Sequence, residues 1–151
     1  MSHKKKNNNI SRRKFVRNAA IVGGSFFIVP RNVLGRGFIA PSDKLNIAAI
    51  GAGGKGADDI NNFSKSPNAN IVALCDVDDR QTVKSRQKFP NAKYYKDFRV
   101  MLEKEKNNID ACSISTPDNC HAVATLAAMQ LGKHVYTQKP LTHDIYESRI
   151  L

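Results

Sequence analysis

The sequence lacks paired cysteines, a long apolar run and any internal repeat. Its three cysteines include no C-x-x-C pair, so neither a disulfide framework nor a metal site is supported. Cys75 and Cys112 lie in apolar, strand-like runs, where a free cysteine packs as a small hydrophobe, and Cys120 lies in a loop. The mildly apolar stretch Ala19–Val29 is shorter than the roughly 20 residues that a membrane-spanning helix needs.

Acidic residues are almost missing from the start of the chain. Residues 1–44 contain ten lysines and arginines and one acid, Asp43, whereas residues 45–151 contain fourteen basic and twelve acidic residues. The net charge of +11 therefore belongs mainly to the leader. A body so close to neutral lacks the electrostatic footprint of a nucleic-acid-binding protein, and we expect no nucleic acid as a partner.

Residues 45–63 have the pattern of a strand, a glycine turn and the start of a helix. The apolar run Leu45–Ile50 leads into GAGGKG at 51–56, a G-x-G-x-x-G motif. In a dinucleotide site the first glycine permits a tight turn, the second lets the backbone approach a pyrophosphate, and the third lets helix and strand pack closely. The phosphates then lie at the helix N-terminus, where free N–H groups favour an anion. The predicted cofactor-binding glycines are Gly51, Gly53, Gly54 and Gly56; a plain glycine turn is the alternative.

An acidic residue follows the second predicted strand. The apolar run at 70–75 ends in Asp76, twenty positions after Gly56. A carboxylate at that offset reaches the adenosine ribose hydroxyls and repels a 2′-phosphate, so NAD is favoured over NADP. Arg80 keeps NADP as a minority alternative, because a guanidinium can hold the extra phosphate. The structural alternative for Asp76 is a turn carboxylate in a cluster with Asp78 and Asp79.

The rest of the body alternates strand and helix patterns. We expect strands at 92–95, 109–115 and 134–137. The helices are expected to begin at four polar residues: Asp79, Asp97, Asp118 and Thr142. Alternation at this spacing predicts an α/β fold with a doubly wound parallel sheet, a Rossmann domain over residues 45–151.

Three residues of one predicted helix and one residue of the last predicted strand are expected in the core. Ala122, Leu126 and Met129 recur at i, i+4 and i+7, which predicts the buried face of their helix. Tyr136 lies in the last predicted strand and is expected to be core.

Two further motifs make a family resemblance specific. The sequence STPDNCHA begins at Ser115, and HVYTQKPLT begins at His134. With the glycine motif and the acid closing the second strand, they resemble the Gfo/Idh/MocA family of nicotinamide-dependent oxidoreductases over the whole body. In that family the loop matching 115–121 lies against the cofactor. The resemblance therefore implies cofactor contacts for Ser115, Thr116, Pro117, Asn119 and His121; for His121 the alternative is a first-turn residue bound only to water.

The motif after the last strand implies the catalytic residue. The family's Glu-Lys-Pro places its lysine beside the nicotinamide, so Lys139 is expected to assist proton movement from the substrate hydroxyl as hydride leaves carbon. Gln138 and Lys139 are then cofactor contacts, and Pro140 fixes the turn. Gln138 departs from the usual glutamate, so we expect its pairing with Lys139 to be weaker and the lysine easier to deprotonate. A solvated surface lysine is the alternative.

The leader carries the pattern of an export signal. The segment SRRKFVR at 11–17 precedes a glycine-containing apolar stretch and resembles a twin-arginine signal. That pathway carries folded proteins, which suits an enzyme that loads its nucleotide in the cytoplasm. We predict that residues 1–44 are a signal peptide and linker, that the twin-arginine machinery is a partner, and that the protein is periplasmic or exported. A solvated basic tail is the alternative.

The resemblance implies an NAD-dependent oxidoreductase that moves hydride between nicotinamide and a carbon of a sugar, cyclitol or polyol. The alternative enzyme is an NAD-dependent glycosidase of the family 109 type, which uses transient oxidation at C3. A nucleotide-binding remnant without activity is the third hypothesis. Members of the family continue into a substrate domain, which is absent here, so the resemblance implies an N-terminal fragment that is inactive alone. A homo-oligomer of the full-length protein is left open as one further partner.

Overall fold

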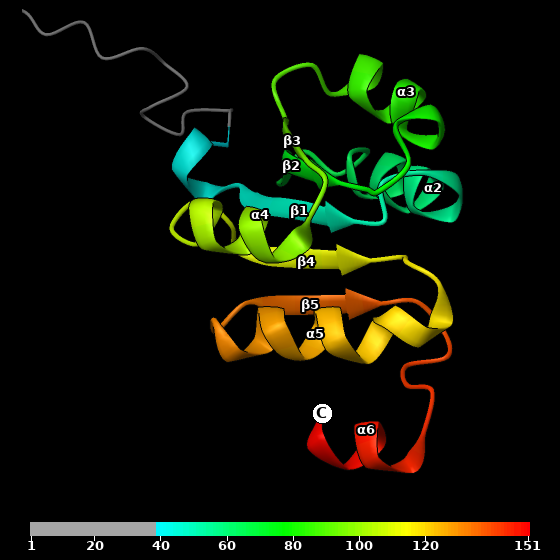
Figure 1. Cartoon of the computed structure of the whole chain (residues 1–151). Coiled ribbons are helices and arrows are strands. Elements are labelled where there is room, and N and C mark those ends of the chain that lie inside the picture. The colour runs from blue at the N-terminus through cyan, green and yellow to red at the C-terminus, as the bar shows by residue number, and fades with distance from the viewer. Residues whose placement is uncertain (1–38) are drawn as a thin grey trace, which may run out of the picture.

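Helices alternate with strands through residues 39–151, the part of the chain that the computed structural model describes (Figure 1). The twin-arginine segment at 11–17 lies outside the described residues. The elements are η1 Pro41–Asp43, β1 Leu45–Ile50, α2 Gly54–Phe63, β2 Ala69–Cys75, α3 Asp79–Lys88, β3 Lys93–Tyr95, α4 Phe98–Glu105, β4 Ala111–Ile114, η2 Asp118–Cys120, α5 His121–Gln130, β5 His134–Thr137 and α6 Ile145–Ile150.

The strands form one parallel sheet in the order β3-β2-β1-β4-β5. The chain moves outward from β1 to β3 and then crosses to the other side of β1 to form β4. All strand carboxyl ends therefore lie at one edge, and the direction of winding reverses between β1 and β4 (Figure 1). Ligands of open α/β sheets bind outside the strand ends at such a switch point. The predicted doubly wound fold is confirmed.

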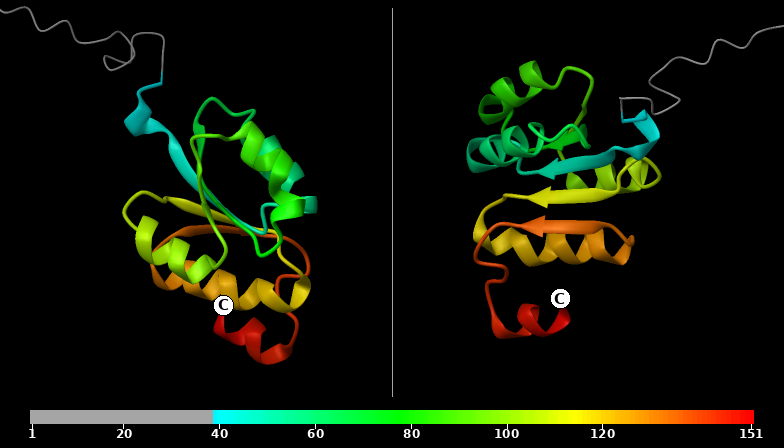
Figure 2. Two further views of the ribbon diagram at one scale, coloured as in Figure 1. Left: turned by 45° about the horizontal axis from the view of Figure 1, so that its top comes forward. Right: turned by 180° about the vertical axis from the view of Figure 1, so that it is seen from behind.

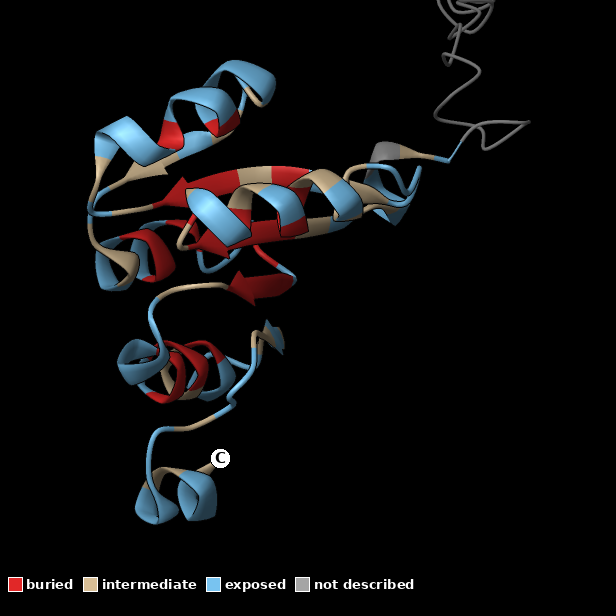
Figure 3. Cartoon of the chain, turned by 90° about the vertical axis from the view of Figure 1, so that its right-hand side faces the viewer, coloured by how far each residue is buried: buried red, intermediate tan, exposed pale blue. Residues whose placement is uncertain are grey.

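The sheet has a hydrophobic core on each face. Helices α4 and α5 cover one face and α2 and α3 the other (Figure 2). Successive residues of β1 alternate between them, so that Ala48 and Ile50 pack toward α4 and α5, and Ile47 and Ala49 pack toward α2. Buried residues concentrate in the strands and the sheet-facing sides of the helices (Figure 3). Burial of each large aliphatic side chain contributes about 1.5–3 kcal/mol.

Three of the four predicted helix starts need correction. Asp97 caps α4 as predicted, accepting from the N–H of Arg99 at 2.9 Å. Asp78, one residue before the expected Asp79, caps α3. Asp118 opens the short turn η2, and α5 begins only at His121. The last helix begins at Ile145 and not near Thr142, because the Asp144 carboxylate accepts from the N–H of Glu147 at 2.8 Å and caps it there.

Two residues expected in the core are exposed. Ala122 is buried as predicted, but Met129 is 43% exposed, because α5 lays small residues such as Ala124 and Ala128 on the sheet. Tyr136 is 50% exposed on the edge strand β5, where its ring forms a T-shaped pair with that of Phe63, with ring centroids 5.3 Å apart. Periodicity identified the elements but not which side of an edge strand is covered.

The three cysteines are free. Cys75 and Cys112 are buried in strands, as expected of packing residues, and burial raises the pKa of Cys75 to about 12 and that of Cys112 to about 11. Cys120 is exposed. Within residues 39–151, no helix is long and apolar enough to cross a membrane.

Candidate cofactor site

The glycine turn between β1 and α2 has no room for side chains at three of its positions. A Cβ on Gly51 would lie 2.6 Å from the Ser115 carbonyl oxygen, and Gly51 has a φ of +81°. A Cβ on Gly53 would lie 2.6 Å from the Cβ of Gln81. A Cβ on Gly56 would lie 1.7 Å from the Gly51 carbonyl oxygen. The three glycines therefore let the turn lie closer to the segment after β4, to α3 and to the start of α2 than any larger residue would allow.

The turn also leaves backbone N–H groups available. The N–H groups of Gly51 and Ala52 donate to the Cys75 carbonyl at 2.9 and 3.1 Å. Within the described part of the chain, the N–H groups of Gly54, Lys55 and Gly56 have no acceptor. These three form the first turn of α2, where unpaired donors and the helix dipole favour an anion. They are the amides that could hold a pyrophosphate.

Asp76 is held beside this turn at the end of β2. Its Oδ2 accepts from the N–H of Gly53 at 2.9 Å, and its Oδ1 accepts from the N–H of Asp78 at 3.0 Å. The side chain is half-buried. Each carboxylate oxygen keeps a second acceptor site, so the group is oriented and still able to bind two hydroxyls. This is the arrangement that a ribose diol requires.

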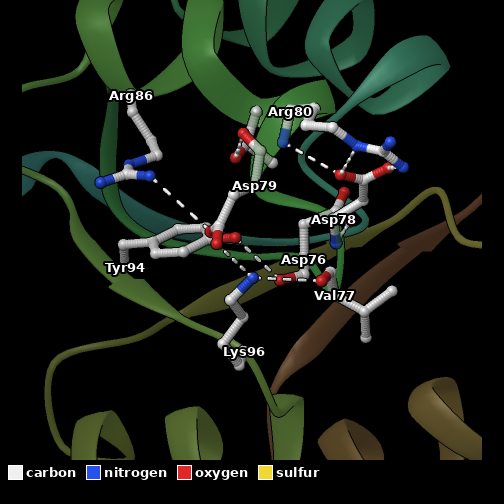
Figure 4. A network of polar contacts seen from close by, with 9 residues as sticks. Asp76, Val77, Asp78, Asp79, Arg80, Arg86, Tyr94 and Lys96 are labelled. Atoms are coloured by element: carbon white, nitrogen blue, oxygen red, sulfur yellow. Dashed lines mark hydrogen bonds and ion pairs between the residues drawn. The ribbon is translucent and has the colours of Figure 1, made fainter.

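The other charges near Asp76 are paired with one another (Figure 4). Arg80 binds both oxygens of Asp78, at 3.0 and 2.9 Å, and these hydrogen bonds lower the pKa of Asp78 to about 2. Lys96 donates to Asp79 at 2.6 Å and to the carbonyl of Val77 at 3.1 Å. Arg80, the residue on which the NADP alternative rests, is thus engaged at the cap of α3. It does not line the cavity at the strand ends, whereas Lys96 does.

A cavity of about 510 Å³ lies at the carboxyl ends of β1, β2 and β4. This volume is within the range of small-molecule sites. Its wall comes from Ile50, Gly51, Gly53, Gly54, Lys55, Cys75, Asp76, Val77, Gln81, Lys96, Phe98, Ser115, Thr116, Pro117, Cys120 and Ala124. The Oγ1 of Thr116 is buried in this region and finds no partner among the described residues. Free amides, an oriented carboxylate and an unpaired hydroxyl together fit a dinucleotide.

The remaining predicted contacts lie around this cavity. Ser115, Thr116 and Pro117 line it, whereas Asn119 is exposed on η2 and does not. Gln138 and Lys139 follow β5, the neighbour of β4, and lie outside the cavity wall. Lys139 is exposed, and its ammonium has no hydrogen bond or ion pair within residues 39–151. Contacts of these outer residues with cofactor stay predictions.

His121 lies between the two loops of the site. It is 1% exposed, with Nδ1 2.6 Å from the Pro140 carbonyl oxygen and Nε2 2.8 Å from the Thr116 carbonyl oxygen. His121 is the first residue of α5, but it lies against two protein carbonyls and is not bound only to water. The ring joins the STPDNCH loop to the turn after β5 and does not line the cavity.

Asp59 is a site residue that the sequence motifs did not identify. It is 6% exposed in α2 and accepts from Lys55 Nζ, Ser115 Oγ and Gln138 Nε2, each at 2.8 Å. Burial alone would raise the pKa of Asp59, but the hydrogen bonds from Lys55, Ser115 and Gln138 outweigh it and lower that pKa. Gln138 is thus paired with Asp59. Within residues 39–151, no hydrogen bond joins Gln138 to Lys139, its expected partner.

The fold and the cavity define a dinucleotide-binding Rossmann domain. The sequence profile of the Gfo/Idh/MocA family, an oxidoreductase family with an NAD-binding Rossmann fold, matches residues 45–151. The chain belongs to this family. The predicted family, fold class and cofactor, NAD, are confirmed.

Relatives by sequence include glycosidases. A glycosyl hydrolase family 109 protein of Solibacter usitatus is 30% identical over 118 residues, which are 71% of this chain and 26% of that protein. An alpha-N-acetylgalactosaminidase of Shewanella oneidensis is 27% identical over 166 residues, 92% of this chain and 35% of that protein. The chain thus spans about a third or less of the length of these relatives.

Structural relatives include inositol dehydrogenases. The myo-inositol 2-dehydrogenase of Lactobacillus plantarum has a TM-score of 0.65 and 30% identity, over 71% of this chain and 31% of that one. The scyllo-inositol dehydrogenase of Lactobacillus casei, solved with NAD(H) and scyllo-inositol, has a TM-score of 0.64 and 25% identity, over 70% and 31%.

Proposed function

We propose that the chain is the NAD-binding part of an oxidoreductase that acts on a secondary alcohol of a sugar, cyclitol or related polyol. The observation that carries this proposal is the cavity at the switch point, where the free amides of the first turn of α2 face the same space as Asp76 and Thr116. The inositol dehydrogenases among the structural relatives support the substrate class.

Each part of the site has a task in this proposal. The amides of Gly54, Lys55 and Gly56 bind the diphosphate, and Asp76 accepts hydrogen bonds from the adenosine ribose. Bound NAD supplies a hydride acceptor at C4 of the nicotinamide. Lys139 takes the proton of the substrate hydroxyl as the carbinol hydrogen leaves with its electron pair, so that a carbonyl forms. Ser115, Thr116 and Pro117 form the wall against which the cofactor lies.

A calorimetric titration of the chain with NAD and NADP tests the binding half of the proposal. We expect saturable binding of NAD and weaker binding of NADP, because Asp76 repels a 2′-phosphate. Failure to bind either nucleotide would leave only the third hypothesis, a remnant without cofactor.

A glycosidase is the second candidate, because named relatives by sequence are glycosyl hydrolase family 109 proteins. In that reaction oxidation at C3 permits elimination of the glycoside, and the hydride returns, so NAD is unchanged overall. Product analysis of the full gene product with sugar, polyol and glycoside substrates separates the two. Net formation of NADH supports the dehydrogenase, whereas release of free sugar at constant NAD supports the glycosidase.

We further propose that the protein is exported by the twin-arginine pathway and acts outside the cytoplasm. The support for export is the SRRKFVR segment at 11–17 and the apolar stretch after it. Export of a folded domain is compatible with loading of NAD before translocation.

A further inference from the structure

Asp59 holds together three segments that are far apart in the sequence. Its own helix, α2, follows the glycine turn; Ser115 follows β4, and Gln138 follows β5. The Asp59 Oδ2 accepts from both Ser115 Oγ and Gln138 Nε2, while Oδ1 accepts from Lys55 Nζ. The carboxylate therefore links α2 and the segment after β4, which both border the cofactor site, to the turn that carries Lys139.

The contact requires a donor at position 138. An ionised carboxylate only accepts hydrogen bonds, whereas the Gln138 amide donates through its NH₂ group. A glutamate in the same place would bring two carboxylates within hydrogen-bond distance in a buried setting, where one of them must keep a proton. The glutamine that departs from the usual family motif therefore matches the aspartate on α2.

We propose that Asp59 and Gln138 are a matched acceptor–donor pair, and that this pair positions the turn bearing Lys139 beside the cofactor site. Asp59 is a positioning residue, since it does not line the cavity. Lys139 itself has no side-chain partner within residues 39–151. The Gln138 side chain connects this turn to α2, while His121 connects it to the loop after β4. The role of the turn in catalysis rests on the proposed function; the pairing does not.

Few other charges act on the pair. Lys55 and Asp58 lie on α2 with Asp59, and Tyr136 approaches Lys55 from β5. Lys55 is bound to Asp59 at 2.8 Å, Asp58 is exposed, and Tyr136 is half-exposed. Two cations could face a glutamate at position 138. Lys55 already binds the opposite oxygen of Asp59, and Lys139, the next residue in the chain, is exposed and makes no hydrogen bond to position 138 within residues 39–151.

Thermal unfolding of the chain as a function of pH tests the pairing without reference to activity. In Gln138→Glu the new carboxyl has a raised pKa, so its share of stability is present at low pH and is lost as the pH rises. We expect the Tm of this variant, relative to the wild type, to fall by about 5 °C between pH 5 and pH 8. The reciprocal double variant Asp59→Asn/Gln138→Glu restores donor and acceptor with the roles exchanged, and we expect it to recover most of the loss at pH 8.

Matched controls are available on the same surfaces. Asp58→Asn removes an exposed carboxylate next to Asp59, and Gln130→Glu adds one at the exposed end of α5. Both should follow the wild-type pH profile. A Gln138→Glu profile parallel to the wild type, or a double variant no better than Gln138→Glu, would overturn the pairing.

Titration with NAD tests the consequence for the site. At pH 8 we expect Gln138→Glu to bind NAD about tenfold more weakly, the equivalent of one charge-assisted hydrogen bond, and the double variant to recover it. A merely structural contact would lower Tm and leave the affinity of the folded fraction unchanged. If the wild type itself does not bind NAD, the proposed function fails, while the Tm series still decides whether Asp59 and Gln138 are paired.

Discussion

Asp76 has a structural task in the fold and, in the proposed function, a binding task as well. Two backbone N–H groups, those of Gly53 and Asp78, hold its oxygens at the rim of the cavity. The same contacts connect the glycine turn to the end of β2. Sequence spacing alone predicted this residue, because its offset from the glycine motif follows from the length of one helix and one strand.

We expect Asp76→Asn to weaken NAD binding about tenfold, because an amide loses the charge that strengthens hydrogen bonds to the ribose hydroxyls. Discrimination against NADP should fall at the same time, since the repulsion of the 2′-phosphate is gone. Calorimetric titration with both nucleotides measures the two effects. Glu103→Gln, an exposed change on α4, is the control. Unchanged affinity for both nucleotides would remove Asp76 from the cofactor site.

Lys139→Met tests the proton-transfer role. The substitution keeps the length of the side chain and removes its amine. Because general acid–base catalysis contributes roughly 10²–10⁴-fold, we expect kcat of the full gene product to fall by about that factor. Lys104→Met on the exposed side of α4 is the control, and a variant at position 139 with normal kcat would contradict the assignment.

At the scale of elements, the link between β3 and α4 depends on one buried carboxylate. Glu105 is 4% exposed at the end of α4 and accepts from Lys93 Nζ at 2.7 Å and Tyr95 OH at 2.6 Å. Hydrogen bonds from Lys93 and Tyr95 lower the pKa of Glu105, and the bond to Glu105 raises the pKa of Tyr95 to about 12. This network fastens the α4 layer to the short edge strand.

We expect Glu105→Ala to lower the free energy of unfolding by about 2 kcal/mol, because the Tyr95 hydroxyl is left without its acceptor. Because the pKa of Glu105 is lower in the folded state, its contribution is present above the unfolded value of about 4.3 and is lost as the pH falls. The difference in unfolding free energy between the wild type and the variant should therefore become smaller below about pH 4. Chemical denaturation at pH 7 and at acidic pH measures both, with Glu103→Ala as the exposed control.

The order and type of the elements could be predicted from the sequence, since they depend on local pattern. What could not be predicted depends on contacts across the sheet. Helical periodicity assigns Met129 to the core, and its place in a strand assigns Tyr136, but which side of a helix or of an edge strand is covered depends on the whole sheet. Asp59 was missed because its partners Ser115 and Gln138 lie 56 and 79 positions away. Its only local signal is a lysine four residues earlier, which is typical of any exposed helix.

At the scale of the whole molecule, the leader at 1–44 differs from the body in charge. If residues 11–17 are a twin-arginine signal, the pathway should depend on the guanidinium groups and not only on positive charge. We expect Arg12→Lys/Arg13→Lys to leave the protein in the cytoplasm, as measured by cell fractionation. Lys4→Arg/Lys5→Arg, which also exchanges two cations, should be exported normally. Normal export of the first variant would favour a basic tail without a targeting role.

His121 places a single imidazole between two acceptors, the carbonyls of Thr116 and Pro140. A neutral ring has one N–H, so it can serve one of these carbonyls while its lone pair faces the other. The two loops of the site therefore meet on opposite nitrogens of one buried ring, at 2.6 and 2.8 Å, so that a change at position 121 would release both loops at once.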